Sequence, residues 1–265
     1  MSNKPKIMGV LNITPDSFSD GGLYHSKISA IDKAKLMLDN GVDIIDIGGE
    51  SSRPNAKEVS IDEELSRVIP VIKSIRKFSD IPISIDTYKP KVMIEAVNNG
   101  ATMINDIYAG QKKNAIETIA KLKVDVCLMH MQKQPQTMQI SPKYNNVVKD
   151  VFNFLKERTE TCIKNGINAE KITIDVGFGF GKTQQHNEEL FKNLKYFKQL
   201  KYPILVGISK KSMIGNIIKQ TNPQKRKTAS LIANILAVKN GATIIRTHDV
   251  QETYEGIKIL EALDG

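Results

Sequence analysis

The feature that most constrains this chain is an Asn-Gly dipeptide that recurs where helical patterns end. It occurs at residues 40–41, 99–100, 165–166 and 240–241, and at three of these places an apolar run follows at once. Glycine and asparagine both tolerate the left-handed conformation that ends a helix, so each dipeptide marks the passage from a helix toward a strand. The sequence therefore predicts a chain built from repeated βα units.

Eight short apolar runs of strand length can be counted along the 265 residues. They cover residues 6–12, 42–49, 81–86, 101–106, 124–130, 171–177, 202–209 and 242–248. Helical stretches with apolar residues at spacings of three and four lie between them, for example 61–78, 147–165 and 228–240. Apolar strands that alternate with helices indicate a parallel sheet covered on both faces. Eight such units favour an α/β fold with one domain over residues 1–265, a closed (β/α)8 TIM barrel. The structural alternative is an open doubly wound sheet, but its glycine fingerprint is missing after the first run.

Composition argues against several classes of protein. The net charge is +9, yet the lysines are spread along the chain and aromatic residues make up only 6%, so we expect no nucleic-acid partner. No apolar stretch has the length of a membrane span and no cleavable leader is evident, so we expect no membrane partner and a cytoplasmic location. Two cysteines without CxxC spacing and four scattered histidines argue against a disulfide framework and a zinc site. Any metal would be a hard ion bound by oxygen.

The segment DVGFGFGKT, residues 175–183, is similar to a phosphate-binding loop but fits neither common template. A P-loop needs a glycine five positions before the glycine of its GK[ST], where this chain has Val176. A dinucleotide fingerprint needs its third glycine at the position of Lys182. We interpret Gly177, Gly179 and Gly181 as positions where the backbone passes close beneath a ligand, with no need to hold a phosphate.

The residues at the predicted strand ends are diagnostic because the chemistry of a parallel barrel lies at its C-terminal mouth. In this sequence these positions are unusually polar. They are Asn12, Glu50, Asp86, Asn105, Asp106, His130, Asp175, Ser209, Lys210, Lys211, Arg246 and His248. Each alone has a structural explanation, since polar residues cap helices and Asp106 or Glu50 could simply close a loop. Polar residues at all eight strand ends together predict a functional site.

The motifs around these strand ends resemble those of the dihydropteroate synthase family of folate biosynthesis. The resemblance runs in order through NITPDSFSDGG, GGESSRPNA, SIDT, INDI, LMHMQKQPQTMQ, DVGFGFGKT, LVGISKKSMIG and RTHDV. It implies a transferase that joins 6-hydroxymethyl-7,8-dihydropterin diphosphate to p-aminobenzoate, with early loss of pyrophosphate and capture of a pterin cation. It also implies Mg²⁺, inhibition by sulfonamides, and a homodimer formed through helices near the C-terminal end.

The resemblance further implies roles for individual residues. The catalytic residues would be Asp86, Lys211 and Asp20. The pterin would be bound by Asp86, Asn105, Met129, Asp175, Gly179, Phe180 and Lys211. The diphosphate would be held by Asn12, Ser52, Arg53, Arg246 and His248, with Asn12 as the Mg²⁺ ligand. The p-aminobenzoate would lie among Phe18, Ser52, Pro54, Ser209 and Lys210, with the Lys210 side chain solvated.

Five positions depart from the family pattern, and two of them, Ser52 and Lys210, lie on the p-aminobenzoate side. The others are Asn55, Lys133 and Val176. Two further functions remain open. A pterin-dependent methyltransferase acting with a corrinoid protein would not need the DSFSDGG lid or the pair Arg246 and His248. A non-catalytic pterin-binding homologue could retain every polar contact to the pterin.

Overall fold

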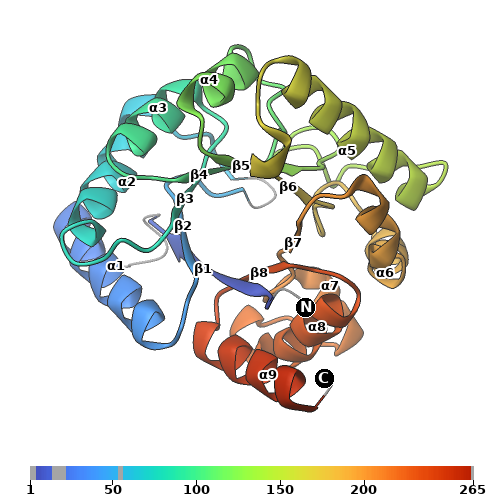
Figure 1. The fold of residues 1–265 in the computed structure, drawn as a ribbon. Helices are drawn as coiled ribbons and strands as arrows, with labels where there is room; N and C mark the ends of the chain where they lie inside the picture. The colour runs from blue at the N-terminus through green and yellow to red at the C-terminus, as the bar shows by residue number, and fades with distance from the viewer. Residues whose placement is uncertain (1–3, 14–21, 53–55, 264–265) are drawn as a thin grey trace.

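Each of the eight predicted apolar runs contains a strand in the computed structural model, which describes residues 4–13, 22–52 and 56–263. The strands are β1 (Lys6–Asn12), β2 (Ile44–Gly48), β3 (Ile83–Asp86), β4 (Met103–Asp106), β5 (Asp125–Met129), β6 (Ile172–Asp175), β7 (Ile204–Val206) and β8 (Ile244–Thr247). All neighbouring strands are parallel, and β8 pairs with β1 through Ile7 and Ile245, which closes the barrel. The predicted TIM-barrel fold is confirmed, and the open sheet is excluded (Figure 1).

Helices surround the barrel (Figure 1). They are α1 (Gly22–Asp39), α2 (Ile61–Ile75), α3 (Pro90–Asn98), α4 (Ala115–Leu122), α5 (Val147–Lys164), α6 (Gln184–Lys192), α7 (Ser212–Ile217), α8 (Lys227–Lys239) and α9 (Val250–Leu263). Short 3-10 helices precede β6, β7 and α8, namely η2 (Ala169–Lys171), η3 (Leu194–Leu200) and η4 (Pro223–Arg226). No helix within the described ranges combines the length and apolar character needed to cross a bilayer.

The four Asn-Gly dipeptides end α1, α3, α5 and α8, as predicted. Their glycines have φ values from 78° to 113°, in the left-handed region where a side chain would be strained. Asn99, Asn165 and Asn240 keep negative φ values between −91° and −100°. Glycine alone therefore makes the reversal that sends the chain back toward the barrel.

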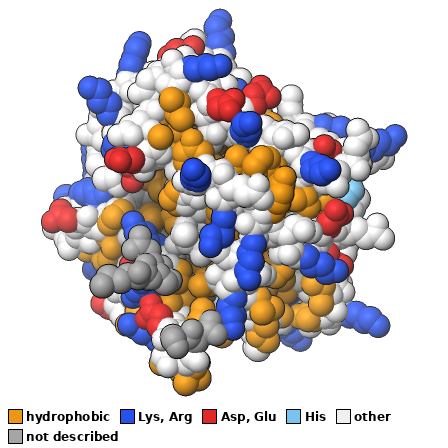
Figure 2. Space-filling model, turned by 45° about the vertical axis from the view of Figure 1, so that its right-hand side comes forward, with side chains coloured by type: hydrophobic (Ala, Val, Ile, Leu, Met, Phe, Trp, Pro, Cys, Tyr) orange, Lys and Arg blue, Asp and Glu red, His pale blue; other side chains and the backbone are white. Residues whose placement is uncertain are grey.

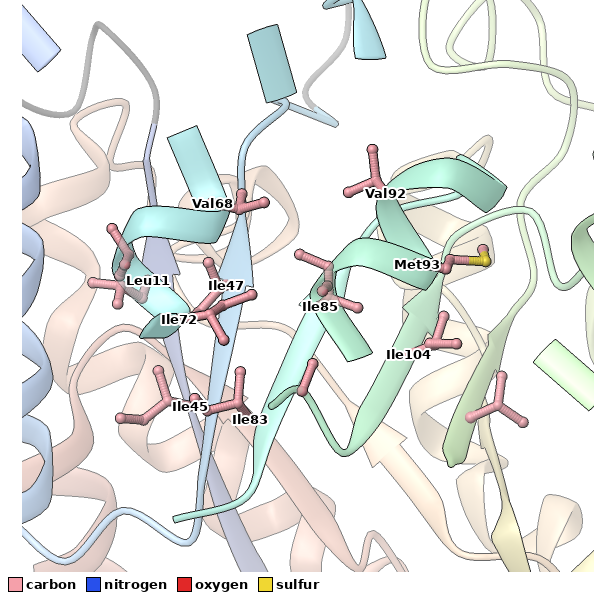
Figure 3. Packing of buried hydrophobic residues seen from close by; sticks show 14 of the residues in the cluster. Leu11, Ile45, Ile47, Val68, Ile72, Ile83, Ile85, Val92, Met93 and Ile104 are labelled. Atoms are coloured by element: carbon pink, nitrogen blue, oxygen red, sulfur yellow. The ribbon is translucent and has the colours of Figure 1, made fainter. Parts of the chain in front are cut away.

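The outward-facing strand residues form the core between the barrel and the helices (Figure 3). Ile47 and Ile85 of the strands, together with Val68 and Ile72 of α2, are fully buried in one cluster. Burial of each such side chain contributes about 1.5 to 3 kcal/mol. The hydrophobic effect therefore fixes the helices to the outer face of the barrel.

The inward-facing residues alternate with these and form a floor inside the barrel. The floor is a buried apolar cluster of Met8, Ile44, Met103, Cys127, Leu205 and Ile244. Side chains alternate along a strand, so the residues two positions further on also point inward, nearer the C-terminal mouth. These are Val10, Asp46, Asn105, Met129, Gly207 and Arg246. An apolar floor therefore supports a layer that carries the polar side chains of Asp46, Asn105 and Arg246.

Charged side chains of both signs lie on the face drawn in Figure 2. On the face drawn in Figure 2, lysine and arginine side chains are scattered, with acidic side chains among them. No continuous basic surface forms on that face.

Candidate active site

Arg246 joins two carboxylates that come from different strands. Its Nε donates to Asp46 Oδ2 of β2 over 2.7 Å, and a terminal nitrogen donates to Asp86 Oδ2 of β3, also over 2.7 Å. Asn105 of β4 donates from Nδ2 to the same Asp46 oxygen over 3.4 Å. Four side chains from four strands therefore meet at the C-terminal end of the barrel interior.

The Asp86 carboxyl has a strongly perturbed environment. Burial raises the pKa of Asp86 to about 7, the Arg246 guanidinium opposes this rise, and the Asp46 charge adds to it. A carboxyl with such a pKa exchanges its proton near neutral pH. Perturbed groups of this kind in a barrel mouth indicate a functional site.

Lys211 lies opposite, on the segment that follows β7. Its Nζ donates to the Phe178 carbonyl over 2.6 Å and sits 4.7 Å from the centre of the Phe180 ring. Burial lowers the pKa of Lys211 to about 8, although the Asp175 charge raises it. Asp175 accepts a 2.8 Å hydrogen bond from the Gly177 amide, and burial raises the pKa of its carboxyl. An ammonium donor and a carboxylate acceptor are thus held at the ends of β6 and β7.

The Lys210 side chain is less exposed than predicted. Its Nζ lies 2.8 Å from Asp249 Oδ1, and its side chain is only 16% exposed, so the expectation of a solvated side chain is wrong. The reason is local backbone geometry, since Lys210 has a φ of 60°. The Ser230 hydroxyl accepts from its amide and an Arg226 nitrogen donates to its carbonyl, over 2.9 and 2.8 Å. This anchoring leaves Lys210 paired with the carboxylate that follows β8.

Two of the three glycines in DVGFGFGKT, Gly177 and Gly181, allow another segment of the protein to approach closely, where a ligand was predicted. A Cβ added at Gly177 would lie 1.9 Å from the His130 carbonyl oxygen, and one at Gly181 would lie 2.7 Å from Gln132 Cβ. Both glycines have positive φ values. The close approach is therefore to the segment after β5. Gly179 is the exception, because its added Cβ would lie 3.5 Å from Lys211 Cδ, beside the candidate site.

Lys182 of the same loop has a structural role. Its Nζ donates to the Gly177 and Phe180 carbonyls over 2.8 and 3.0 Å, and it lies 2.9 Å from His130 Nδ1. The side chain is buried. The loop carbonyls therefore hold this ammonium inward, where a P-loop lysine would turn outward to a phosphate.

An apolar wall borders the polar groups on the β4 to β6 side. Met129 is buried in a cluster with Ile107, Met131 and Met138, and Phe180 packs against this cluster. Such a wall beside a few polar groups suits a flat heterocycle.

Two strand-end residues, Asp106 and Glu50, have structural roles. The Asp106 carboxylate accepts from the Tyr108 and Gly110 amides over 2.8 and 2.7 Å and closes its loop. Glu50 pairs with buried Lys89 over 2.5 Å and accepts from the Val59 amide over 3.1 Å. Neither carboxylate is needed to explain the site.

Asn12, Arg246 and His248, three of the predicted diphosphate residues, lie at or next to the ends of β1 and β8. A Cβ added at Gly48 would lie 3.5 Å from Asn12 Oδ1 and 3.8 Å from Asp86 Oδ2, so this glycine leaves space between the two side chains. His248 Nδ1 lies 3.3 Å from the buried Ser209 hydroxyl. Ser52 is half-buried. The predicted site residues Phe18, Asp20, Arg53 and Pro54, and the variant position Asn55, lie outside the described residues.

Sequence reasoning missed Asp46. The signal was a lone aspartate in the middle of the apolar run 42–49, two positions before Gly48 and therefore on the inward face. Polar residues at strand ends do not indicate it, because Asp46 lies in the middle of its strand.

Comparison with known proteins agrees with this geometry. Residues 8–248 match the family model described as pterin binding enzyme. The chain is 51% identical to the dihydropteroate synthase of Haemophilus influenzae, over 97% of this chain and 94% of that protein.

Two solved structures superpose closely, both with a TM-score of 0.94. The Xanthomonas albilineans dihydropteroate synthase with 4-aminobenzoic acid is 40% identical, covering 99% of this chain and 94% of the other. The Yersinia pestis enzyme in a sulfonamide drug complex is 45% identical, covering 98% and 94%. The chain therefore belongs to the pterin-binding enzyme family and, within it, to the dihydropteroate synthases.

Proposed function

We propose that this chain condenses 6-hydroxymethyl-7,8-dihydropterin diphosphate with p-aminobenzoate to give 7,8-dihydropteroate and pyrophosphate. The arrangement of Asp86, Asn105, Asp175 and Lys211 around one mouth carries the proposal. A pterin edge alternates hydrogen-bond donors and acceptors, which carboxylates, an amide and an ammonium can match. Met129 and Phe180 supply apolar surface for the ring faces.

The diphosphate would lie near Asn12, Arg246 and His248, with Ser52 and Arg53 beside it. Barrels often bind phosphate at the end of the last strand, and an arginine can bind it through two nitrogens at once. The described residues contain no cluster of three His, Cys, Asp or Glu side chains that could hold a metal. The Asn12 amide oxygen would be one ligand of Mg²⁺. Substrate phosphate oxygens and water would be the others, and Mg²⁺ is commonly bound in this way. Bound Mg²⁺ would neutralise charge on the departing pyrophosphate.

The chemical step would begin with cleavage of the bond between the pterin methylene carbon and the diphosphate oxygen. The resulting cation is delocalised over the pterin, and the ionised Asp86 would stabilise it more than the neutral ground state. The aniline nitrogen then forms the new C–N bond and loses a proton. Lys211 would hold the pterin from the opposite side, and Asp20 would face the reaction centre.

The p-aminobenzoate would lie near Ser209 and Lys210, with Phe18, Ser52 and Pro54 completing its pocket. Sulfonamides would compete there, because they imitate this substrate. Lys210 is tied to Asp249, so it would meet the substrate carboxylate only if that pair opens or is shared.

The decisive experiment measures pyrophosphate release by the purified protein with each substrate omitted in turn. Release that requires both the pterin diphosphate and p-aminobenzoate supports the proposal. A protein that binds the pterin without releasing pyrophosphate would be a non-catalytic homologue. Methyl transfer to a corrinoid protein would indicate the methyltransferase.

We also infer a cytoplasmic location and a homodimer formed near the C-terminal end. In support of the dimer, apolar side chains are exposed on three elements there, including Ile217 of α7, Ile232 and Leu236 of α8, and Ile259 of α9. Ile232 and Leu236 are four residues apart and so share one helix face. Sedimentation of Leu236→Lys against wild type tests the contact.

A further inference from the structure

Asp46 is a fully buried carboxylate in the middle of β2. Its Oδ2 atom receives the Nε–H of Arg246 over 2.7 Å and an Asn105 amide hydrogen over 3.4 Å. Its other oxygen, Oδ1, is buried and has no hydrogen-bond partner within the described part of the chain. Burial of a carboxylate is costly even when it is paired.

Stability does not account for an aspartate at this position. Buried ion pairs are often no more stabilising than apolar side chains of the same volume. The preceding residue on the inward face, Ile44, belongs to the apolar floor. An apolar side chain at position 46 would therefore have extended this floor. What distinguishes position 46 is its contact with the arginine that also reaches Asp86.

The two contacts of Arg246 are not equivalent. Nε lies at the base of the rigid, planar guanidinium, so a bond there fixes the rotation of the whole plane. The terminal nitrogen that meets Asp86 lies at the far end, toward the space left open by Gly48.

We infer that Asp46 is a positioning residue for the reaction proposed above. It holds Arg246 at Nε, so that the terminal nitrogen can pass from Asp86 to an anionic substrate without the side chain turning away. When the terminal nitrogen leaves Asp86, the Oδ2 atom of Asp86 becomes free to accept a hydrogen bond from the pterin edge. The inference rests on the proposed function for its substrate, and on the observed contacts for its geometry.

The first test uses Asp46→Asn, which keeps the shape of the side chain and removes its charge. We expect kcat/KM for the pterin diphosphate to fall about tenfold or more, while KM for p-aminobenzoate changes by less than about twofold. The matched control is Ser84→Ala. Ser84 is the register partner of Asp46 on β3, is equally buried, and has an Oγ without a partner in the described residues. The control should change neither constant by more than about twofold.

A double-mutant cycle separates positioning from a general structural effect. In an Arg246→Met background, Asp46→Asn should weaken binding of the pterin diphosphate by less than about twofold further, because the group that Asp46 positions is gone. Equal losses in the two backgrounds would overturn the inference.

A spectroscopic measurement on the wild type covers the case in which a variant fails to fold. With 15N-labelled arginine, the Arg246 Nε–H signal should persist when a dihydropterin analogue and pyrophosphate are added, while the signals of its terminal nitrogens move. Loss of the Nε–H signal on addition would contradict anchoring by Asp46. If the wild type releases no pyrophosphate from the two substrates, the proposed function fails, yet the Nε–H signal in wild type and Asp46→Asn still decides whether Asp46 holds Arg246.

Discussion

Lys182 places its ammonium nitrogen 2.9 Å from His130 Nδ1 in the protein interior. Burial lowers the pKa of both groups well below their usual values, and the Lys182 charge lowers that of His130 further. The contact ties the loop that carries Gly179 and Phe180 to the end of β5. These contacts hold the loop whose Gly179 and Phe180 are predicted to contact the pterin.

Replacement of Lys182 by methionine should destabilise the protein by about 2 to 4 kcal/mol, because the Gly177 and Phe180 carbonyls lose their donor. Urea unfolding measures the change. Exposed Lys195 offers a matched control, and Lys195→Met should lie within about 0.5 kcal/mol of wild type. An unchanged midpoint for Lys182→Met would mean that the ammonium does not support the loop.

The dependence of kcat/KM for the pterin diphosphate on pH should be a narrow bell. Asp86 must be ionised and its pKa is raised to about 7, so activity should fall as pH drops through 7. Lys211 must be protonated and its pKa is lowered to about 8, so activity should also fall as pH rises through 8. Lys211→Arg should remove the alkaline fall at reduced activity, since arginine stays charged. A profile that is flat from pH 6 to 9 would contradict both assignments.

The same shifts fix the sign of two contributions to folding. The folded pKa of Asp86 lies above its ordinary value of 3.8, so its contribution to stability is lost as pH rises toward 7. The folded pKa of Lys211 lies below 10.5, so its charge costs stability below pH 8, and this cost disappears as pH rises from 8 to 10.5.

Asp86→Asn should keep the fold and lose about tenfold or more of turnover, because the charge that faces the pterin cation is removed. The thermal midpoint should not fall, since burial already disfavours ionised Asp86. Rapid-quench turnover and calorimetry on the same preparation give both quantities. Wild-type turnover from a well-folded variant would remove Asp86 from its role.

Lys211→Ala should weaken binding of a pterin analogue by about 1.5 to 3 kcal/mol, since a charged donor is lost from a desolvated site. Lys210→Ala should instead raise KM for p-aminobenzoate, and Lys210→Arg should be tolerated because arginine can still reach Asp249. Calorimetric titration of the pterin analogue compares the two alanine variants. Equal, small losses would show that neither lysine binds the pterin.

Binding of p-aminobenzoate should be weak to the protein alone and stronger in the presence of pyrophosphate, Mg²⁺ and a pterin. The reason is that the family resemblance places part of its pocket on the segments 14–21 and 53–55, which the other ligands would also contact. Removal of Mg²⁺ with EDTA should return the affinity to that of the bare protein. Equally tight binding under all conditions would exclude ordered assembly.

The barrel could be predicted from the sequence because its signals are local: apolar runs, helical periodicity and glycines that end helices. The site could be predicted only in part. The places of Asp86, Asn105 and Asp175 at strand ends could be predicted, whereas the inward position of Asp46 depends on knowing which face of β2 points inward. The Lys210–Asp249 pair could not be predicted, because it depends on a φ of 60° at Lys210 and on two chain segments that meet only in the fold. The inward direction of Lys182 likewise depends on loop carbonyls that no residue pattern specifies.

Because side chains alternate along each strand, neighbouring residues have different roles. Outward residues pack against the helices, and inward residues line the barrel interior. Ile45 and Ile47 pack in the outer core with the helices, while Asp46 between them points into the barrel and meets Arg246. A change of chemistry at an inward position need not disturb the packing on the other face, and a change in packing need not alter the chemistry. Such a scaffold can acquire a new substrate by substitutions at every second residue, which gives a physical basis for the many different reactions carried by barrels of this kind.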